Sequence, residues 1–224
     1  MTHKSGSWDD LKIHVSSSEF DHVSFDFWRT MAFSNPKFKE ARTNLFVSLN
    51  ERINTESVQD SFSKIGIAYN RGMEADNTIL SPEVLYNQVL DDLNVNDELH
   101  KVVNTCYDLF LKYPPMLDPK LKNILEIISL SGCSISITSN TAFIPGSLIR
   151  QFIDDQLGSG IFNFSIFSDE VKFAKPNCEI FDLMYGYLSK DKILDKRNIL
   201  HIGDNFDTDV KGAKNFGISS YLLH

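Results

Sequence analysis

Seven polar residues of this 224-residue chain lie just beyond short apolar segments that predict buried strands. The carboxyl ends of parallel strands meet at one edge of a sheet, so these side chains are predicted to converge there. They are Asp26 and Thr30 after the first segment, Ser139 and Asn140 after the second, Lys175 after the third, and Asp204 and Asp209 after the fourth.

Carboxylates, a hydroxyl and a lysine at one point suit the transfer of a phosphoryl group. A carboxylate can attack phosphorus and form a covalent acyl phosphate. A second carboxylate can help to bind Mg²⁺, which prefers oxygen ligands and substrate phosphate. The hydroxyl and the lysine can then stabilise negative charge on the transferred group.

The elements that must position these residues alternate between strand and helix. This alternation predicts right-handed crossovers and a doubly wound parallel sheet with helices on both faces, an α/β fold. Before it, Leu11, Ile13 and Val15 alternate with polar residues and predict a short edge strand. The predicted strands are 22–27, 134–138, 164–167, 198–202 and 218–222, and the predicted helices are 118–130, 146–156, 178–188 and 208–216.

The segment between the first strand and the rest has helical periodicity throughout. Asn35 is a predicted N-cap followed by Pro36, and Phe38, Ala41 and Leu45 follow at helical spacing. Three further amphipathic segments extend to residue 111. We therefore predict an all-helical subdomain, residues 34–113, inserted into one α/β domain made of residues 1–33 and 114–224.

The amino-acid composition and net charge of the chain argue against several classes of function. Hydrophobic residues make up 42% and charged residues 23% of the chain, as in ordinary globular proteins, and the net charge is −8. The negative charge argues against nucleic acid or an anionic membrane as partner. Three cysteines without a C-x-x-C pair argue against a disulfide framework. With no secretory signal at the N-terminus, the chain is predicted to be cytoplasmic.

Four segments in order resemble the motifs of the haloacid dehalogenase-like hydrolase superfamily. They are S-F-D-F-W-R-T from Ser24, I-T-S-N-T from Ile137, K-P-N-C-E-I-F from Lys175 and H-I-G-D-N-F-D-T-D-V-K-G-A from His201. The resemblance extends from Asp21 to Leu223. It implies a Rossmann-like core, with residues 34–113 as a helical cap inserted after the first motif and closing over the site.

The resemblance also implies roles for single residues. Asp26 would be the nucleophile and a Mg²⁺ ligand, and Ser139 would bind the phosphoryl oxygens. Lys175 would neutralise Asp26 and the transition state. Asp204 and the backbone carbonyl of Trp28 would complete the metal site. Asp209 would order Lys175 or a metal-bound water. Thr30, Asn140 and, in the cap, Arg71 are candidates for contact with a small phosphorylated substrate, and His201 is predicted to be a buried core residue.

Trp28 departs from the pattern of the superfamily's phosphatases. They usually carry a second Asp at this position, two residues after the nucleophile, as general acid and base. Indole cannot donate that proton, and general acid catalysis is worth about 10²–10⁴ in rate. Two alternatives therefore stay open: a carbon–halogen hydrolase, in which this position is also aromatic, and a binding or regulatory protein without turnover.

Overall fold

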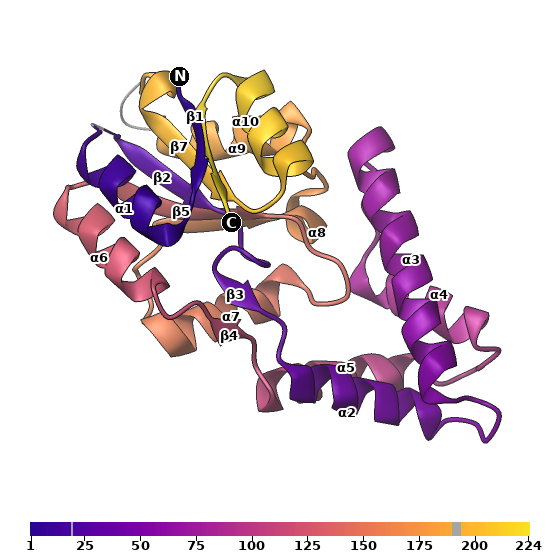
Figure 1. The fold of residues 1–224 in the computed structure, drawn as a ribbon. Coiled ribbons are helices and arrows are strands. Elements are labelled where there is room, and N and C mark those ends of the chain that lie inside the picture. Colours follow the sequence, from indigo (N-terminus) through magenta and orange to yellow (C-terminus); the bar gives the residue numbers. More distant parts are fainter. Residues whose placement is uncertain (19, 190–193) are drawn as a thin grey trace.

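The computed structural model describes residues 1–18, 20–189 and 194–224 of the chain. Its centre is a six-stranded sheet in which every neighbouring pair of strands is parallel (Figure 1). This confirms the predicted α/β fold with a Rossmann-like parallel sheet. The strand order is β1 (His3–Gly6), β8 (Ser219–Leu223), β7 (Ile199–Gly203), β2 (His22–Phe25), β5 (Ser134–Ser139) and β6 (Phe164–Phe167).

Helices cover both faces of this sheet. Apolar side chains of α1 (Trp8–Ser16), α6 (Leu121–Leu130) and α7 (Gly146–Leu157) pack on one face, where Phe25 and Ile137 of the central strands also point. On the other face, α9 (Cys178–Leu188) and α10 (Lys211–Phe216) form a second apolar cluster. Side chains alternate between faces along a strand, so the two clusters draw on alternate strand residues.

The N-terminal segment differs from the prediction of an edge strand over residues 11–15. Those residues lie in α1, and the edge strand is β1, which pairs with β8. Ser7 caps α1 and forms a capping box with Asp10. Leu11 and Val15, four residues apart, are buried against the core, whereas Ile13 is exposed. Leu11 and Val15, spaced by four, lie on one face of the helix. The alternation of three apolar residues was too short to distinguish a helix from a strand.

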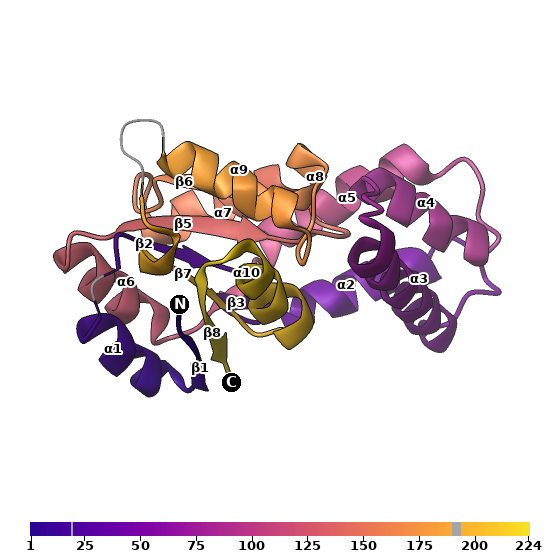
Figure 2. The same ribbon diagram turned by 90° about the horizontal axis from the view of Figure 1, so that it is seen from above.

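Four helices form a lobe to one side of the sheet (Figures 1 and 2). A two-stranded antiparallel ribbon, β3 (Ala32–Phe33) with β4 (Met116–Leu117), lies where the chain leaves the sheet and returns. The Asn35 side chain donates to the Pro114 carbonyl at 3.0 Å, joining the two crossing segments. The division at residues 34 and 113 stays a prediction. The helices are α2 (Pro36–Val47), α3 (Thr55–Asp76), α4 (Pro82–Asp92) and α5 (Leu99–Lys112).

The lobe has its own apolar cluster, which includes Phe46, Phe62 and Tyr86. Phe143, in the loop between β5 and α7, packs against this cluster and so links the lobe to the carboxyl edge of the sheet. Within the described residues, no helix has both the length and the apolar character required to span a membrane. Three short elements complete the described residues: α8 (Ser168–Val171), a single turn at Lys196–Asn198 and a turn of π-helix at Phe206–Val210.

Candidate active site

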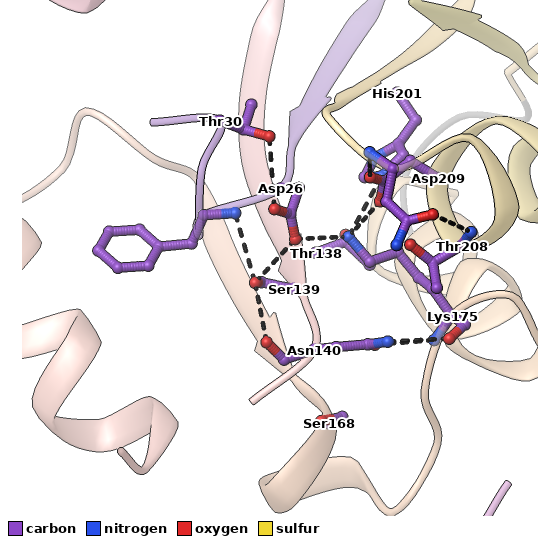
Figure 3. Close-up of polar contacts among 12 residues, drawn as sticks. Asp26, Thr30, Thr138, Ser139, Asn140, Ser168, Lys175, His201, Thr208 and Asp209 are labelled. Carbon is purple, nitrogen blue, oxygen red and sulfur yellow. Dashed lines mark hydrogen bonds and ion pairs between the residues drawn. The ribbon is translucent and has the colours of Figure 1, made fainter. Parts of the chain in front are cut away.

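Asp26 lies at the carboxyl end of β2, a central strand. The Asp26 N–H donates to the Ile202 carbonyl of β7 at 2.8 Å, which places the residue just beyond the paired part of the sheet. Its side chain is buried, and Ser139 at the end of β5 donates to Oδ1 at 2.9 Å (Figure 3). The Thr30 hydroxyl approaches Oδ2 at 3.4 Å. One carboxylate oxygen is thus held firmly and the other only loosely.

Lys175 enters the site from the loop between α8 and α9. The side chain of Asn140 fixes this loop, because it accepts from the Lys175 N–H and donates to the Lys175 carbonyl, both at 2.8 Å. Lys175 is 1% exposed, and its Nζ lies 2.7 Å from Oδ1 of Asp26 and 2.7 Å from Oδ1 of Asp209. The structure therefore uses the amide of Asn140 to position the lysine.

Asp204 and Asp209 belong to the turn that follows β7. Residues Phe206–Val210 form one turn of π-helix, and the Asn205 N–H donates to Oδ2 of Asp209 at 3.0 Å. A Cβ on Gly203 would lie 2.2 Å from Cγ of Asp209, so only glycine permits this close approach. Asp204 points to the partly open side, where Arg29 Nε lies 3.1 Å from its Oδ2.

His201 in β7 extends the network beneath these carboxylates. Its Nε2 lies 3.2 Å from Oδ1 of Asp209 and 3.4 Å from Lys175 Nζ, while its Nδ1 contacts the Ser24 hydroxyl at 3.2 Å. The ring is fully buried. Burial, with the charge of Lys175, lowers the pKa of His201 to about 4, so the imidazole is neutral at pH 7. The histidine is a core residue, as predicted, and it also contacts the charged pair.

The site contains more carboxylates than positive charges to neutralise them. Burial and the nearby Asp209 raise the pKa of Asp26 to about 6 despite the charge of Lys175. Burial and Asp209 likewise raise the pKa of Asp204. For Asp209, Lys175 and His201 outweigh burial and lower the pKa. Although burial alone would lower the pKa of Lys175, the two carboxylates raise it. Lys175 and Asp209 are therefore the charged pair, Arg29 is the counter-ion of Asp204, and Asp26 is left in excess.

Comparison with known proteins agrees with the resemblance that the four motifs indicate. Residues 172–224 match a family model described as HAD-hydrolase-like, where HAD stands for haloacid dehalogenase. A magnesium-bound structure of the putative HAD-hydrolase YfnB from Bacillus subtilis superposes with a TM-score of 0.72 at 13% identity, covering 91% of this chain and 88% of that one. The chain has the fold of the haloacid dehalogenase-like hydrolases. Its predicted resemblance to that superfamily is thus confirmed.

Other structures with the HAD fold include proteins with different activities. A HAD phosphatase from Thermococcus onnurineus superposes with a TM-score of 0.64 at 18% identity, covering 91% of this chain and 86% of that one. A 2-haloacid dehalogenase from Pseudomonas syringae pv. Tomato DC3000 gives 0.61 at 17% identity, with coverage of 91% and 86%. A comparison with curated protein sequences gives no match. The fold is therefore common to phosphatases and dehalogenases.

The carboxylates of this HAD-fold chain fit a divalent cation. One ligand atom from each of Asp26, Asp204 and Asp209 lies within 4.8 Å of the others. Lys175 already occupies Oδ1 of Asp26 and of Asp209. The remaining donors are Oδ2 of Asp26 and the carboxylate of Asp204, which is paired with the exposed Arg29. Within the described residues, no hydrogen-bond donor contacts the Trp28 carbonyl in the adjoining loop. This all-oxygen set is the kind that Mg²⁺ prefers.

A cleft opens above Asp26 and is lined from both the sheet edge and the lobe. Trp28 is half-buried in its wall, with its ring packed against Phe27 at 4.9 Å between centroids. Arg71 is exposed and is not among the lining residues. The structure therefore does not bring Arg71 to the candidate site. Along α3 the cleft is lined by Asn70, Met73 and Glu74.

Arg42 of α2 is a cleft residue that the sequence analysis missed. Its guanidinium lies 3.8 Å from the ring centroid of Phe62 and also near Phe38 and Phe143. Its Nε is buried without a hydrogen-bond partner, and with Lys39 it gives the lobe side of the cleft positive charge. The spacing of Phe38, Arg42 and Phe46 by four places the arginine on an apolar helix face, which was the available signal.

Proposed function

We propose that this chain is a Mg²⁺-dependent hydrolase of a small phosphorylated metabolite, acting through an aspartyl-phosphate on Asp26. The observation that carries the proposal is the buried Asp26 carboxylate, held by Ser139 and Lys175 beside Asp204 and Asp209 of the last motif. Support comes from the phosphatases among the structures of the same fold. The small substrate fits the negative overall charge, which disfavours nucleic acid and membranes, and we place the protein in the cytoplasm.

In this mechanism an oxygen of Asp26 attacks phosphorus, and the bond from phosphorus to the leaving oxygen breaks. Water then hydrolyses the acyl phosphate and regenerates the carboxylate. Lys175 stays protonated between Asp26 and Asp209, so it donates to the phosphoryl oxygens without taking part in proton transfer. Ser139 contributes a further donor. Asp26, Asp204 and the Trp28 carbonyl would hold Mg²⁺, which neutralises charge on the phosphoryl group.

Trp28 restricts the leaving group. Its indole replaces the usual acid, so no carboxyl proton at this position reaches the departing oxygen. The mechanism therefore favours leaving groups that are stable as anions, or substrates that supply their own proton. The indole instead packs against Phe27 in the wall of the cleft.

We further propose that residues 34–113 form the cap that chooses the substrate. Helix α2 of this segment presents Phe38, Lys39 and Arg42 to the cleft, opposite Asp26. A cation stacked among aromatic rings, with an unpartnered buried Nε, is suited to bind an anionic group at the far end of the substrate.

The test is a screen of phosphorylated metabolites with purified protein, with and without Mg²⁺, beside Asp26→Asn. Asparagine keeps the shape of the side chain but is a poor nucleophile, so turnover is expected only with Mg²⁺ and only in the natural sequence. Phosphate release by Asp26→Asn at the same rate would show that Asp26 is not the nucleophile. Absence of turnover across the screen would favour a binding or regulatory protein.

Carbon–halogen hydrolysis is the second candidate, and Trp28 is the observation that favours it. Attack of Asp26 on carbon expels a halide, which leaves without a proton and so requires no acid at position 28. Dehalogenases also occur among the structures of this fold. Halide release from 2-haloacids in the absence of Mg²⁺ would place this reaction first. Asp204, an additional carboxylate beside Asp26, is better explained by a cation.

A further inference from the structure

Arg29 is a charged residue of the first motif to which the mechanism above assigns no role. Its Nε lies 3.1 Å from Oδ2 of Asp204. The Arg29 backbone has φ 62°, and its N–H donates to the Ala32 carbonyl at 2.8 Å. In the same turn the Met31 N–H donates to the Phe27 carbonyl at 2.9 Å. This hydrogen-bonded turn sets the direction in which the Arg29 side chain leaves the backbone, toward Asp204, although 79% of the side chain is exposed.

Asp204 differs from the other two carboxylates in its counter-ion. Lys175 contacts Asp26 and Asp209, both deeply buried. Among the described residues, Arg29 is the cation paired with Asp204, whose side chain is 18% exposed. Three carboxylates and two cations leave this cluster one positive charge short. The uncompensated negative charge would attract a divalent cation. A cation that binds Asp204 would have to compete with Arg29, which is already paired with this carboxylate.

The geometry points to an exchange: a divalent cation displaces Arg29 from Asp204, and the released guanidinium then binds the anionic group of the substrate. This inference rests on the proposed function. An ion pair with one highly exposed partner is weak, so it can be displaced. Arg29 lines the same cleft as Asp26, where the phosphoryl group would bind. Guanidinium is well suited to phosphate, because its planar donors can bind two oxygens at once.

The exchange predicts opposite changes in two affinities on Arg29→Gln, each measured by isothermal titration calorimetry. Mg²⁺ should bind about two- to fivefold more tightly, because it no longer competes with a guanidinium for Asp204. Inorganic phosphate, added to the Mg²⁺-loaded protein, should bind about fivefold more weakly or worse. The gain in Mg²⁺ affinity should shrink as NaCl is raised, since salt already weakens the ion pair in the natural sequence.

Arg71→Gln is the matched control, because it removes one positive charge from an exposed position outside the cleft. It should leave both affinities unchanged. An Arg29→Gln protein that binds Mg²⁺ no more tightly, or phosphate no more weakly, than the natural sequence overturns the exchange. A variant that loses both affinities also overturns it, because that result is expected of a structural residue.

Asp204→Asn separates failure of the exchange from failure of the proposed function. Loss of Mg²⁺ binding in this variant would show that the calorimetric signal comes from the Asp204 site. If Asp204→Asn binds Mg²⁺ like the natural sequence, or if the natural sequence binds none, the metal site and the exchange are both overturned. If Asp204→Asn loses Mg²⁺ while Arg29→Gln matches the natural sequence, the exchange alone is overturned.

Discussion

Replacing Lys175 by Met should destabilise the fold more than any surface change, because Lys175 neutralises two buried carboxylates. The lysine is 1% exposed, and its Nζ lies 2.7 Å from both Asp26 and Asp209. Methionine preserves most of the volume of the side chain and removes the charge. Asp26 and Asp209 are then left facing each other in a site from which water is largely excluded.

The magnitude follows from the cost of an uncompensated buried charge. Removing one partner of a buried ion pair typically costs about 3–5 kcal/mol. A domain of this kind has a total free energy of unfolding of about 5–15 kcal/mol, so Lys175→Met should lose a large share of it. Lys211→Met is the control, because Lys211 pairs with Asp207 on the surface, where an ion pair is worth about 0–1 kcal/mol.

The pH dependence gives the sign of the effect. Without Lys175, burial and mutual repulsion should raise the pKa of Asp26 and Asp209 above that of unfolded carboxyl groups, about 3.9. The folded state then binds more protons than the unfolded state. Stability of Lys175→Met is therefore greatest at low pH and falls as pH rises through these pKa values. Asp26→Asn added to Lys175→Met should recover part of the loss, because one buried charge is removed.

The assay is urea unfolding followed by circular dichroism between pH 4 and 8, for the natural sequence, both single Lys variants and the double variant. A Lys175→Met protein within about 1 kcal/mol of the natural sequence at pH 7, with no added pH dependence, would refute this account. Its carboxylates would then have to be solvated or neutral when Lys175 is absent.

Three further predictions concern other residues. Trp28→Asp should raise phosphatase turnover by at most about 10²–10⁴-fold, whereas Trp28→Asn should not; an equal gain in both would indicate steric access in place of acid catalysis. Burial, with the charge of protonated His201, lowers the pKa of His22 to about 3. The free energy of unfolding should therefore fall as pH drops from about 6.5 toward 3, by up to about 1.4 kcal/mol per pH unit. Urea unfolding of His22→Gln should show a flatter dependence on pH. Arg42→Met should raise KM for an anionic substrate about tenfold or more with little change in kcat, and the exposed neighbour on α2, Lys37→Met, should leave KM unchanged.

Several parts of the fold were predictable because their signals are local. Helix α9 and strand β6 lie where the alternation of helical and strand patterns placed them. Asp26, Ser139 and Lys175 follow strands that apolar patterns identify, and parallel strands bring such residues to one edge. The segment at residues 11–15 was predicted wrongly, since three alternating apolar residues also fit one side of a short helix.

What the sequence determined by itself is therefore the order of the elements and which chemical groups lie at their ends, because hydrophobic period and helix caps depend on near neighbours. Tertiary structure decided which groups touch. It paired Arg29 with Asp204. It also placed Asn140 where its side chain hydrogen-bonds the backbone of Lys175. Arg42 lines the cleft, whereas Arg71 is exposed outside it. These contacts depend on helix rotation and loop path, which are set by packing between segments far apart in the chain, and no local pattern encodes them.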